Sequence, residues 1–181
     1  TYTKDQRIKY IDRFSQDQKM YSRESLYWGN YKSDQCTLLL SRTLASASGE
    51  LSFARTYSYD DRGNVLQNTL YGNLSGHSEI NPIVSEDGSI IENGCENFTK
   101  QFRYSDDGFN LILWESDGLH ETSYEYESES NRLTAKFIGE ANKIHLREFY
   151  EYNCEASLTK KIIDDGLSKD KNDLSGVTER L

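Results

Sequence analysis

Apolar and polar residues alternate along much of the chain with a period of two. In the segment 132–137, Leu133, Ala135 and Phe137 alternate with polar neighbours. The segment 51–59 shows the same alternation around Arg55, and the segment 144–152 shows it with an interruption at Glu148. This period places one side of an extended strand against a core. It predicts strands over these segments, and in the last of them it places Ile144, Leu146, Tyr150 and Tyr152 on the core side.

Short polar stretches that contain glycine or asparagine separate these strands. Asp-Gly and Gly-Asn pairs supply the positive φ that compact hairpin loops require. Loops of this length join antiparallel neighbours, and no long segment has a helical period. The sequence therefore predicts an all-β fold, an antiparallel β-hairpin meander that forms a curved sheet with at most short helical turns. Turns are expected at 105–108, 116–118, 128–131, 139–142, 153–157 and 164–166.

Two parts of the chain depart from this regular pattern. The segment from about 72 to 100 holds several glycines and Pro82, the only proline, and we interpret it as an insertion with a short hairpin at Glu86-Asp87-Gly88. The segment from about 164 to 181 is a polar loop and tail, in which Val177–Leu181 is expected to begin a further strand. The whole chain, 1–181, is predicted to be a single β-domain.

A ten-residue pattern recurs along the chain, and its clearest copy is 57–66. Each copy is a strand that ends in aromatics, a polar turn, and a strand that begins on an aliphatic residue. Weaker copies lie at 102–111, 124–133 and 149–158, with a degenerate one at 13–20. Asp60 is expected to accept a backbone N–H two residues on, and Gly63 to be left-handed. The residues expected to end strands, form turns and set the hairpin register are Tyr57, Tyr59, Asp60, Gly63, Asn64, Tyr104, Asp106, Gly108, Tyr126 and Tyr152.

The clearest copy, Tyr-Ser-Tyr-Asp-Asp-Arg-Gly-Asn-Val-Leu, resembles the YD repeat of RHS-repeat proteins. This family includes bacterial polymorphic toxin shells, the C components of Tc toxin complexes, wall-associated proteins and teneurins. Counting the intervening strands, the resemblance covers most of 10–165, although the third and fourth copies lack the turn glycine. The runs 69–76 and 164–166 are similar to segments of long RHS proteins of environmental chlamydiae.

The resemblance implies that the hairpins form an arc of a hollow β-shell. In the toxins of this family, such a shell encloses an effector domain and keeps it sequestered until delivery. The resemblance would make this chain a non-catalytic structural segment of a secreted or cell-surface protein. Its partners would be the rest of the RHS shell and the enclosed effector. The family's core segment, with an Asp-Pro-hydrophobic-Gly stretch for self-cleavage, has no counterpart, because Pro82 follows Asn81. Self-cleavage and effector activity are therefore not carried over.

Charge and composition narrow the possible partners. The chain has 181 residues and a formal net charge of −9, which argues against nucleic-acid binding. No apolar run approaches the roughly 20 residues that a membrane span needs. Cys36, Cys95 and Cys154 form neither a metal-type pair nor a disulfide scaffold. Since the chain begins at Thr1 rather than at a methionine, we expect a fragment or a processed product.

No catalytic, cofactor or metal constellation is expected. The three histidines are scattered without metal-type spacing, and the paired aspartates sit beside turn glycines, where backbone hydrogen bonding explains them. No spaced acidic loop of the calcium-binding kind occurs. These residues are His77, His120 and His145, with the pairs Asp60/Asp61, Asp106/Asp107 and Asp164/Asp165.

Two other functions remain open from the sequence. An adhesive β-module would bind a glycan or a partner protein, and exposed Trp28 and Trp114 would stack on sugar rings, although core packing is the commoner role of such residues. A glycosidase would need two carboxylates about 5–10 Å apart in one cleft, which no pattern here indicates. Open strand edges at the ends of the sheet would also allow self-association.

Overall fold

The computed structural model describes residues 1–4, 6–29, 37–128, 130–141 and 143–181. Over these ranges the protein is all-β and contains no helix, so none is present there of a length and apolarity suited to crossing a membrane. The predicted antiparallel hairpin meander is confirmed. Cys36 and parts of two predicted turns, 128–131 and 139–142, lie outside the described residues.

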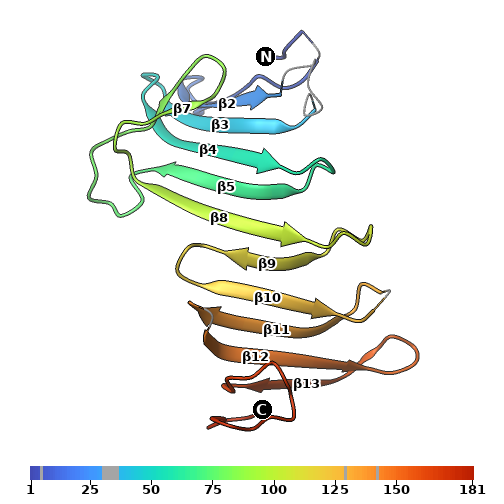
Figure 1. The fold of residues 1–181 in the computed structure, drawn as a ribbon. Coiled ribbons are helices and arrows are strands. Elements are labelled where there is room, and N and C mark those ends of the chain that lie inside the picture. The colour runs from blue at the N-terminus through green and yellow to red at the C-terminus, as the bar shows by residue number, and fades with distance from the viewer. Residues whose placement is uncertain (5, 30–36, 129, 142) are drawn as a thin grey trace. The chain divides into compact units, whose positions relative to one another are not determined.

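The described strands form one eleven-stranded antiparallel sheet and one two-stranded hairpin. Neighbours in the large sheet follow chain order, except that β8 (Asn97–Tyr104) comes after β5 (Val65–Gly72) because β6 (Ile83–Val84) and β7 (Ile90–Ile91) pair with each other (Figure 1). The sheet is open, with β1 (Tyr10–Phe14) and β13 (Leu158–Asp164) as its outermost strands. The chain divides within β8 into two compact units, Thr1–Thr99 and Lys100–Leu181.

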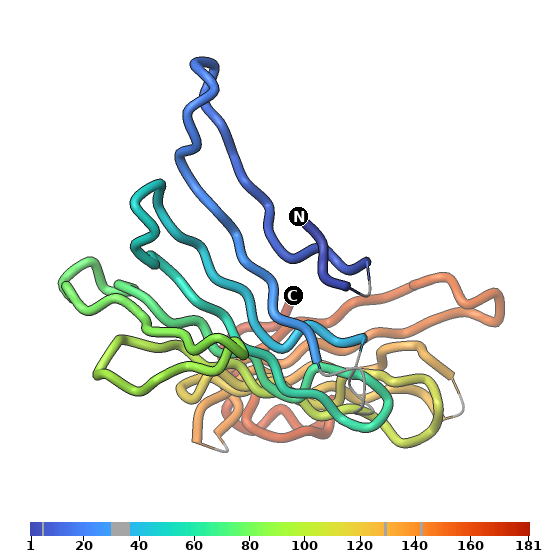
Figure 2. Tube along the Cα trace, turned by 90° about the horizontal axis from the view of Figure 1, so that it is seen from above, coloured from blue at the N-terminus to red at the C-terminus, as the bar shows by residue number. Residues whose placement is uncertain are grey.

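The first unit contains the hairpins β1–β2 and β3–β4, the strand β5, and the predicted short hairpin, here β6–β7, whose turn includes Gly88. In Figure 2 the hairpin ends of this unit fan out from one another, as the twist of antiparallel strands requires. The bounds are β1 Tyr10–Phe14, β2 Met20–Trp28, β3 Leu39–Ser46, β4 Leu51–Tyr59, β5 Val65–Gly72, β6 Ile83–Val84 and β7 Ile90–Ile91.

The two faces of this unit differ in what covers them. One face is packed with small residues, and Ser41, at its centre, is 1% exposed. The hydroxyl of Ser41 donates a 2.6 Å hydrogen bond to the carbonyl of Gly88, so the β6–β7 hairpin lies over this face. The opposite face holds larger and more polar side chains, including Arg42 and Arg55, which are direct cross-strand partners. The buried residues of the covered face are Ser41, Thr43, Ala45, Ala54 and Thr69.

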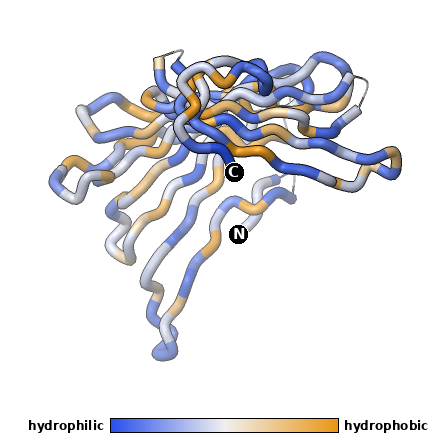
Figure 3. Tube along the Cα trace, turned by 90° about the horizontal axis from the view of Figure 1, so that it is seen from below, coloured by the Kyte–Doolittle hydropathy of each residue, from blue (hydrophilic) through white to orange (hydrophobic). Residues whose placement is uncertain are grey.

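The second unit contains the rest of β8 (Asn97–Tyr104) and the strands that follow it. The alternation of hydrophobic and hydrophilic positions along the strands is visible in Figure 3. A small core on one face consists of Ala135, Phe137, Phe149 and Ile162, with the two phenylalanine rings edge to face at 5.8 Å. The strands are β9 Ile112–Ser116, β10 Glu121–Tyr126, β11 Leu133–Glu140, β12 Lys143–Tyr152 and β13 Leu158–Asp164.

The core face of β11 is the predicted one, but the prediction for the middle of β12 was wrong. Phe149 and Arg147 are the buried residues of β12, whereas Leu146 and Tyr150, on the other parity, are only half-buried. Ile144 does pack against the core, since the pairing with β11 shifts register between Ile138 and Gly139. The reason is cross-strand pairing: Phe149 lies opposite Ala135, and Arg147 lies opposite Phe137. An arginine at a core position breaks the apolar alternation, so the sequence pattern indicated the wrong side.

The polar tail folds back onto the last strand of the sheet. Ile163 and Leu181 exchange two backbone hydrogen bonds, of 2.8 and 3.0 Å, and Arg180 forms an isolated antiparallel bridge with Asp164. The strand expected at Val177–Leu181 is thus present only as a bridge at its last residues. The tail occupies part of the outer edge of β13.

Candidate functional site: strand-end clasps and the arginine-centred tail

A recurring contact joins the end of one strand to the start of the strand before it. The hydroxyl of Tyr59, the last residue of β4, donates a 2.7 Å hydrogen bond to the carbonyl of Leu39, the first residue of β3. Tyr126 and Tyr152 end β10 and β12, and they donate in the same way, at 2.9 Å each, to the first residues of β9 and β11, Ile112 and Leu133. We call this contact the strand-end clasp.

A β-bulge precedes the aromatic residue at every clasp. The register of the pairing shifts between Ser58 and Tyr59, and equivalent shifts precede Tyr126 and Tyr152. A bulge adds a residue to one strand and increases the local twist. Here the added residue lies in the following strand, at Leu66, Thr134 and Thr159. Burial raises the pKa of Tyr59 and of Tyr126, which keeps both hydroxyls protonated as donors.

Two further aromatic residues occupy equivalent places. Tyr104 ends β8, also just after a bulge, and lies opposite Ile112 in the pairing with β9. Trp28 ends β2, again after a bulge, and its indole N–H donates a 2.8 Å hydrogen bond to the carbonyl of Ile8. The repeat analysis did not include Trp28, although its place before Gly29 at the end of a strand could have indicated it. Tyr57 has a different role, since its ring stacks on that of Tyr59 at 6.3 Å.

We expect Tyr59→Phe to lower the free energy of unfolding of the first unit by about 1 kcal/mol. The substitution keeps the ring but leaves the Leu39 carbonyl without its hydroxyl donor. Urea denaturation measures the change. Tyr21→Phe is the matched control, because Tyr21 lies in β2 and is 56% exposed, and this control should stay within a few tenths of a kcal/mol. If the Tyr59→Phe variant were as stable as the wild type, the hydrogen bond of the clasp would not contribute to the stability of the first unit.

A second recurring element is a five-residue turn. In each copy the first N–H donates to the fifth carbonyl and the fourth N–H donates to the first carbonyl, with N···O distances of 2.9–3.2 Å. The fourth residue is left-handed, with φ of +86° at Gly63 and +62° at Ala156. Glycine adopts this conformation without the steric cost that a side chain adds. The turns are 15–19, 46–50, 60–64, 85–89 and 153–157, so the degenerate copy at 13–20 has the same turn.

The side chain of the first turn residue reinforces the loop. The Asp60 carboxylate accepts the N–H groups of Arg62 and Asn64 and the side-chain amide of Asn64, at 2.8–3.0 Å. Burial alone would raise the pKa of Asp60, but these hydrogen bonds outweigh it and the net shift is downward. Asn153 plays the same part in the turn 153–157, where its side-chain oxygen accepts two backbone N–H groups.

The turn of the second repeat copy is longer and uses a different aspartate. The N–H of Ser105 donates to the carbonyl of Leu111, two residues farther along than in the 60–64 turn. The carboxylate of Asp107 accepts the N–H of Phe109, at 3.0 Å. Gly108 is left-handed, at +86°, and has open space around it.

The tail is wound around a buried arginine that the repeat analysis missed. Arg147 is 0% exposed. Its guanidinium donates to the carboxylate of Asp164 and to the backbone carbonyls of Ser168, Asp170 and Asp173, the last three at 2.6–2.8 Å. A planar group with five N–H donors suits this task, because it satisfies several acceptors at once.

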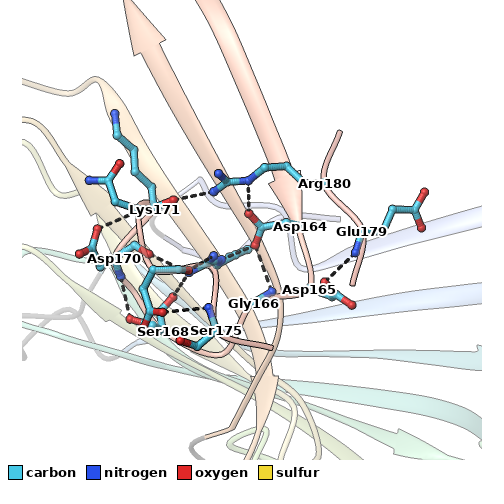
Figure 4. Close-up of polar contacts among 12 residues, drawn as sticks. Asp164, Asp165, Gly166, Ser168, Asp170, Lys171, Ser175, Glu179 and Arg180 are labelled. Atoms are coloured by element: carbon cyan, nitrogen blue, oxygen red, sulfur yellow. Dashed lines mark hydrogen bonds and ion pairs between the residues drawn. The ribbon is translucent and has the colours of Figure 1, made fainter. Parts of the chain in front are cut away.

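Asp164 and Asp165 accept hydrogen bonds from different residues of the tail (Figure 4). Asp164 also accepts the N–H of Gly166 at 3.0 Å and the guanidinium of Arg180 at 2.8 Å. Burial alone would raise its pKa, but the hydrogen bonds, first that from Arg147, shift it downward. Asp165 accepts the hydroxyl and N–H of Thr178 and the N–H of Glu179, which lower its pKa to about 2.

These pKa shifts predict that acid weakens the tail. The carboxyl of Asp165 has a folded-state pKa of about 2 against an ordinary 3.8, so its stabilisation is present above pH 4 and is lost as the pH falls towards 2. We expect the midpoint temperature of thermal unfolding of the second unit to fall as the pH is lowered over this interval. In Asp165→Asn this midpoint should fall less steeply with pH. Asp17→Asn, in the exposed β1–β2 turn, is the control. An unchanged acid slope in Asp165→Asn would contradict this assignment.

The described histidine, cysteine and acidic residues considered for metal binding do not gather into one site. No group of three or more histidine, cysteine or acidic residues able to hold a metal ion occurs among the described residues. The rings of both tryptophans are half-buried, and each has an arginine over it: Arg7 over Trp28 at 5.7 Å and Arg103 over Trp114 at 4.4 Å. One face of each ring is therefore already occupied, which leaves less surface for stacking on a sugar. Cys95 and Cys154 are not joined to each other.

Comparison with known proteins gives only a distant likeness. No protein-family model matches this chain, and no curated protein matches it either. Among solved structures, chains in the crystal structures of TcdB2-TccC3-Cdc42 and TcdB2-TccC3-TEV are similar over 87% of this chain, with 18% and 17% sequence identity and TM-scores of 0.45. A third similar structure is that of TcdB2-TccC3, with 17% identity and the same TM-score and coverage. The present chain spans 8% of the length of each of those chains.

Proposed function

We propose that this chain is a non-catalytic wall segment of an RHS-type β-shell, in a secreted or cell-surface protein. The observation that carries the proposal is the strand-end clasp, which recurs with the same donor position and the same acceptor position in three hairpins. A repeated contact of this kind closes the open end of each hairpin in the same way, and a wall built from like hairpins would use such a repeated closure. The YD-type sequence at 57–66 supports the same interpretation.

The coverage of the sheet also supports a structural role. In the first unit the β6–β7 hairpin lies on one face, and in the second unit the tail from 165 onwards covers the face that contains Arg147. Both covers are held by hydrogen bonds to backbone carbonyls, and neither belongs to the repeat. They stabilise an open sheet that has little apolar core of its own, since six hydrophobic residues are buried among those described.

The partners follow from the strand order. β1 is an outermost strand and has one strand neighbour, β2. Thr1 occupies its other edge at Tyr10, and beyond Tyr10 this edge offers backbone groups to a further strand. We assign this edge to the remainder of the shell in the same polypeptide, and the polypeptide enclosed by the shell is the second partner. Self-association through the same edge is the expected behaviour of the segment when it is isolated.

The intact mass and sequence of the natural polypeptide that contains this segment test the proposal. We expect a polypeptide several times longer, with further YD-type hairpins and a separate domain for the shell to enclose. A natural polypeptide no longer than this chain could enclose nothing and would overturn the proposal. It would leave the adhesive module as the better account.

A further inference from the structure

A groove on the uncovered face of the first unit differs in charge from the rest of the protein. It has a volume of about 470 Å³, and its charged lining is three arginines, Arg13, Arg42 and Arg55, with one carboxylate, Glu24. The formal charge of the groove is therefore +2, whereas that of the whole chain is −9. The covering hairpin β6–β7 lies on the opposite face, so it does not block this one.

The single carboxylate is shared between two of the arginines. Glu24 accepts Arg13 at 3.1 Å and Arg42 at 3.4 Å, through different oxygens. Both of those arginines are partly exposed, with 43% and 46% of their side chains accessible, whereas the side chain of Glu24 is 15% exposed. Each oxygen of Glu24 therefore already faces one guanidinium, and in the described part of the chain neither oxygen is bonded to Arg55.

Arg55 is the unmatched cation. It is half-buried, and its Nε atom is buried without a hydrogen-bond partner. Its direct cross-strand partner is Arg42, another cation, and like charges at facing positions destabilise a sheet. A buried guanidinium N–H without an acceptor adds a further cost. A ligand that supplies a carboxylate at this point would remove both costs.

Apolar side chains alternate with the arginines along the groove. Leu44 follows Arg42 by two residues on β3, and Phe53 precedes Arg55 by two residues on β4. Leu44 and Phe53 are themselves cross-strand partners, so a cationic row lies beside an apolar row. Residues two apart on a strand are separated by about 6.6 Å, which is also the spacing of side chains on one face of an extended peptide.

From this arrangement we infer that the groove binds an extended acidic peptide segment, whose carboxylate pairs with Arg55 and Arg42 and whose next same-face apolar side chain lies on Leu44 and Phe53. Guanidinium groups bind carboxylates through paired hydrogen bonds. The spacing of the two rows selects a peptide over a small anion. The inference does not depend on the shell proposal, because a wall segment or an adhesive module could hold such a peptide.

The test is calorimetric titration of the whole chain with a capped Glu-Ser-Leu-Ser-Glu peptide. Wild-type protein should bind it, with an affinity that falls as salt is added. Arg55→Gln should bind about tenfold more weakly or worse, because a charge-assisted hydrogen bond is lost. The matched control is Lys4→Gln, which removes one positive charge from an exposed position in the same unit and should bind like the wild type.

Three comparison ligands identify what the groove recognises. The peptides Gln-Ser-Leu-Ser-Gln and Glu-Ser-Ser-Ser-Glu remove the charge and the apolar side chain in turn, and both should bind more weakly. Inorganic phosphate should also bind more weakly. No binding by the wild type, equal binding by Arg55→Gln, or phosphate binding as tight as that of the acidic peptide would each overturn the inference. The melting temperature of Arg55→Gln should be at or above that of the wild type, since the facing cations are relieved, so weak binding would not reflect unfolding.

Discussion

Arg147→Met is expected to lower the free energy of unfolding of the second unit by about 3–5 kcal/mol, the largest effect of any single substitution considered. The substitution leaves the buried carboxylate of Asp164 without its main partner and removes the donor from three backbone carbonyls in the tail. Breaking a buried ion pair by removing one partner is costly because the other charge stays behind. Urea denaturation measures the loss, and trypsin cleavage at Lys169 and Lys171 should report release of the tail.

The control for this substitution is Arg132→Met. Arg132 pairs with Glu127 across a surface turn, where the side chains are 31% and 44% exposed. Exposed ion pairs contribute little, so this variant should lose less than about 1 kcal/mol. If Arg147→Met were as stable as Arg132→Met, with the tail still protected from trypsin, the arginine would not be the centre that holds the tail.

Gly88→Ala is expected to have the second-largest effect, a loss of about 2–5 kcal/mol in the free energy of unfolding of the first unit. Gly88 has a φ of +89°, and an added Cβ would lie 2.5 Å from the Cβ of Tyr27 and from the hydroxyl of Ser41. The left-handed conformation costs an alanine about 1–2 kcal/mol. Displacing the turn would also break the hydrogen bond from the buried Ser41 hydroxyl, which costs about 1–3 kcal/mol more.

Gly49→Ala isolates the cost of the backbone conformation. Gly49 occupies the same fourth position in the turn 46–50, with a φ of +87°, and an added Cβ there would meet nothing within 4 Å. The difference between the two variants in urea denaturation therefore measures how strongly the β6–β7 hairpin is held on the sheet. Equal losses in both variants would mean that this hairpin contributes nothing to the stability of the first unit.

The local features of the fold could be predicted because they depend on residues that are close together in the sequence. Strand alternation and turn chemistry involve positions two to four apart, so the strand 133–140 and the short hairpin at Gly88 follow from the sequence. The place of the clasp was also visible, because an aromatic residue ends the first strand of each repeat copy. Its partner was not, because the acceptor is a backbone carbonyl about 14–20 residues earlier.

The non-local features could not be predicted for a physical reason. A period of two shows that β12 has two sides, but which side is buried depends on what covers it. Arg147 is buried because backbone carbonyls 21–26 residues later fold over it, and a charged residue in a strand ordinarily indicates the solvent side. The Asp-Asp-Gly run at 164–166 indicated a turn, but not that Asp164 pairs with this arginine.

The central claim is that this segment is part of a wall around another polypeptide. Protease protection in the natural polypeptide tests this claim most directly. The full-length protein would be treated with protease, and the cleavage rate of its parts outside the YD-type hairpins would be compared with that of the same parts produced alone. A wall predicts strong protection in the full-length protein, lost when Arg147→Met destabilises this segment. Cleavage at the same rate in both settings would contradict the claim.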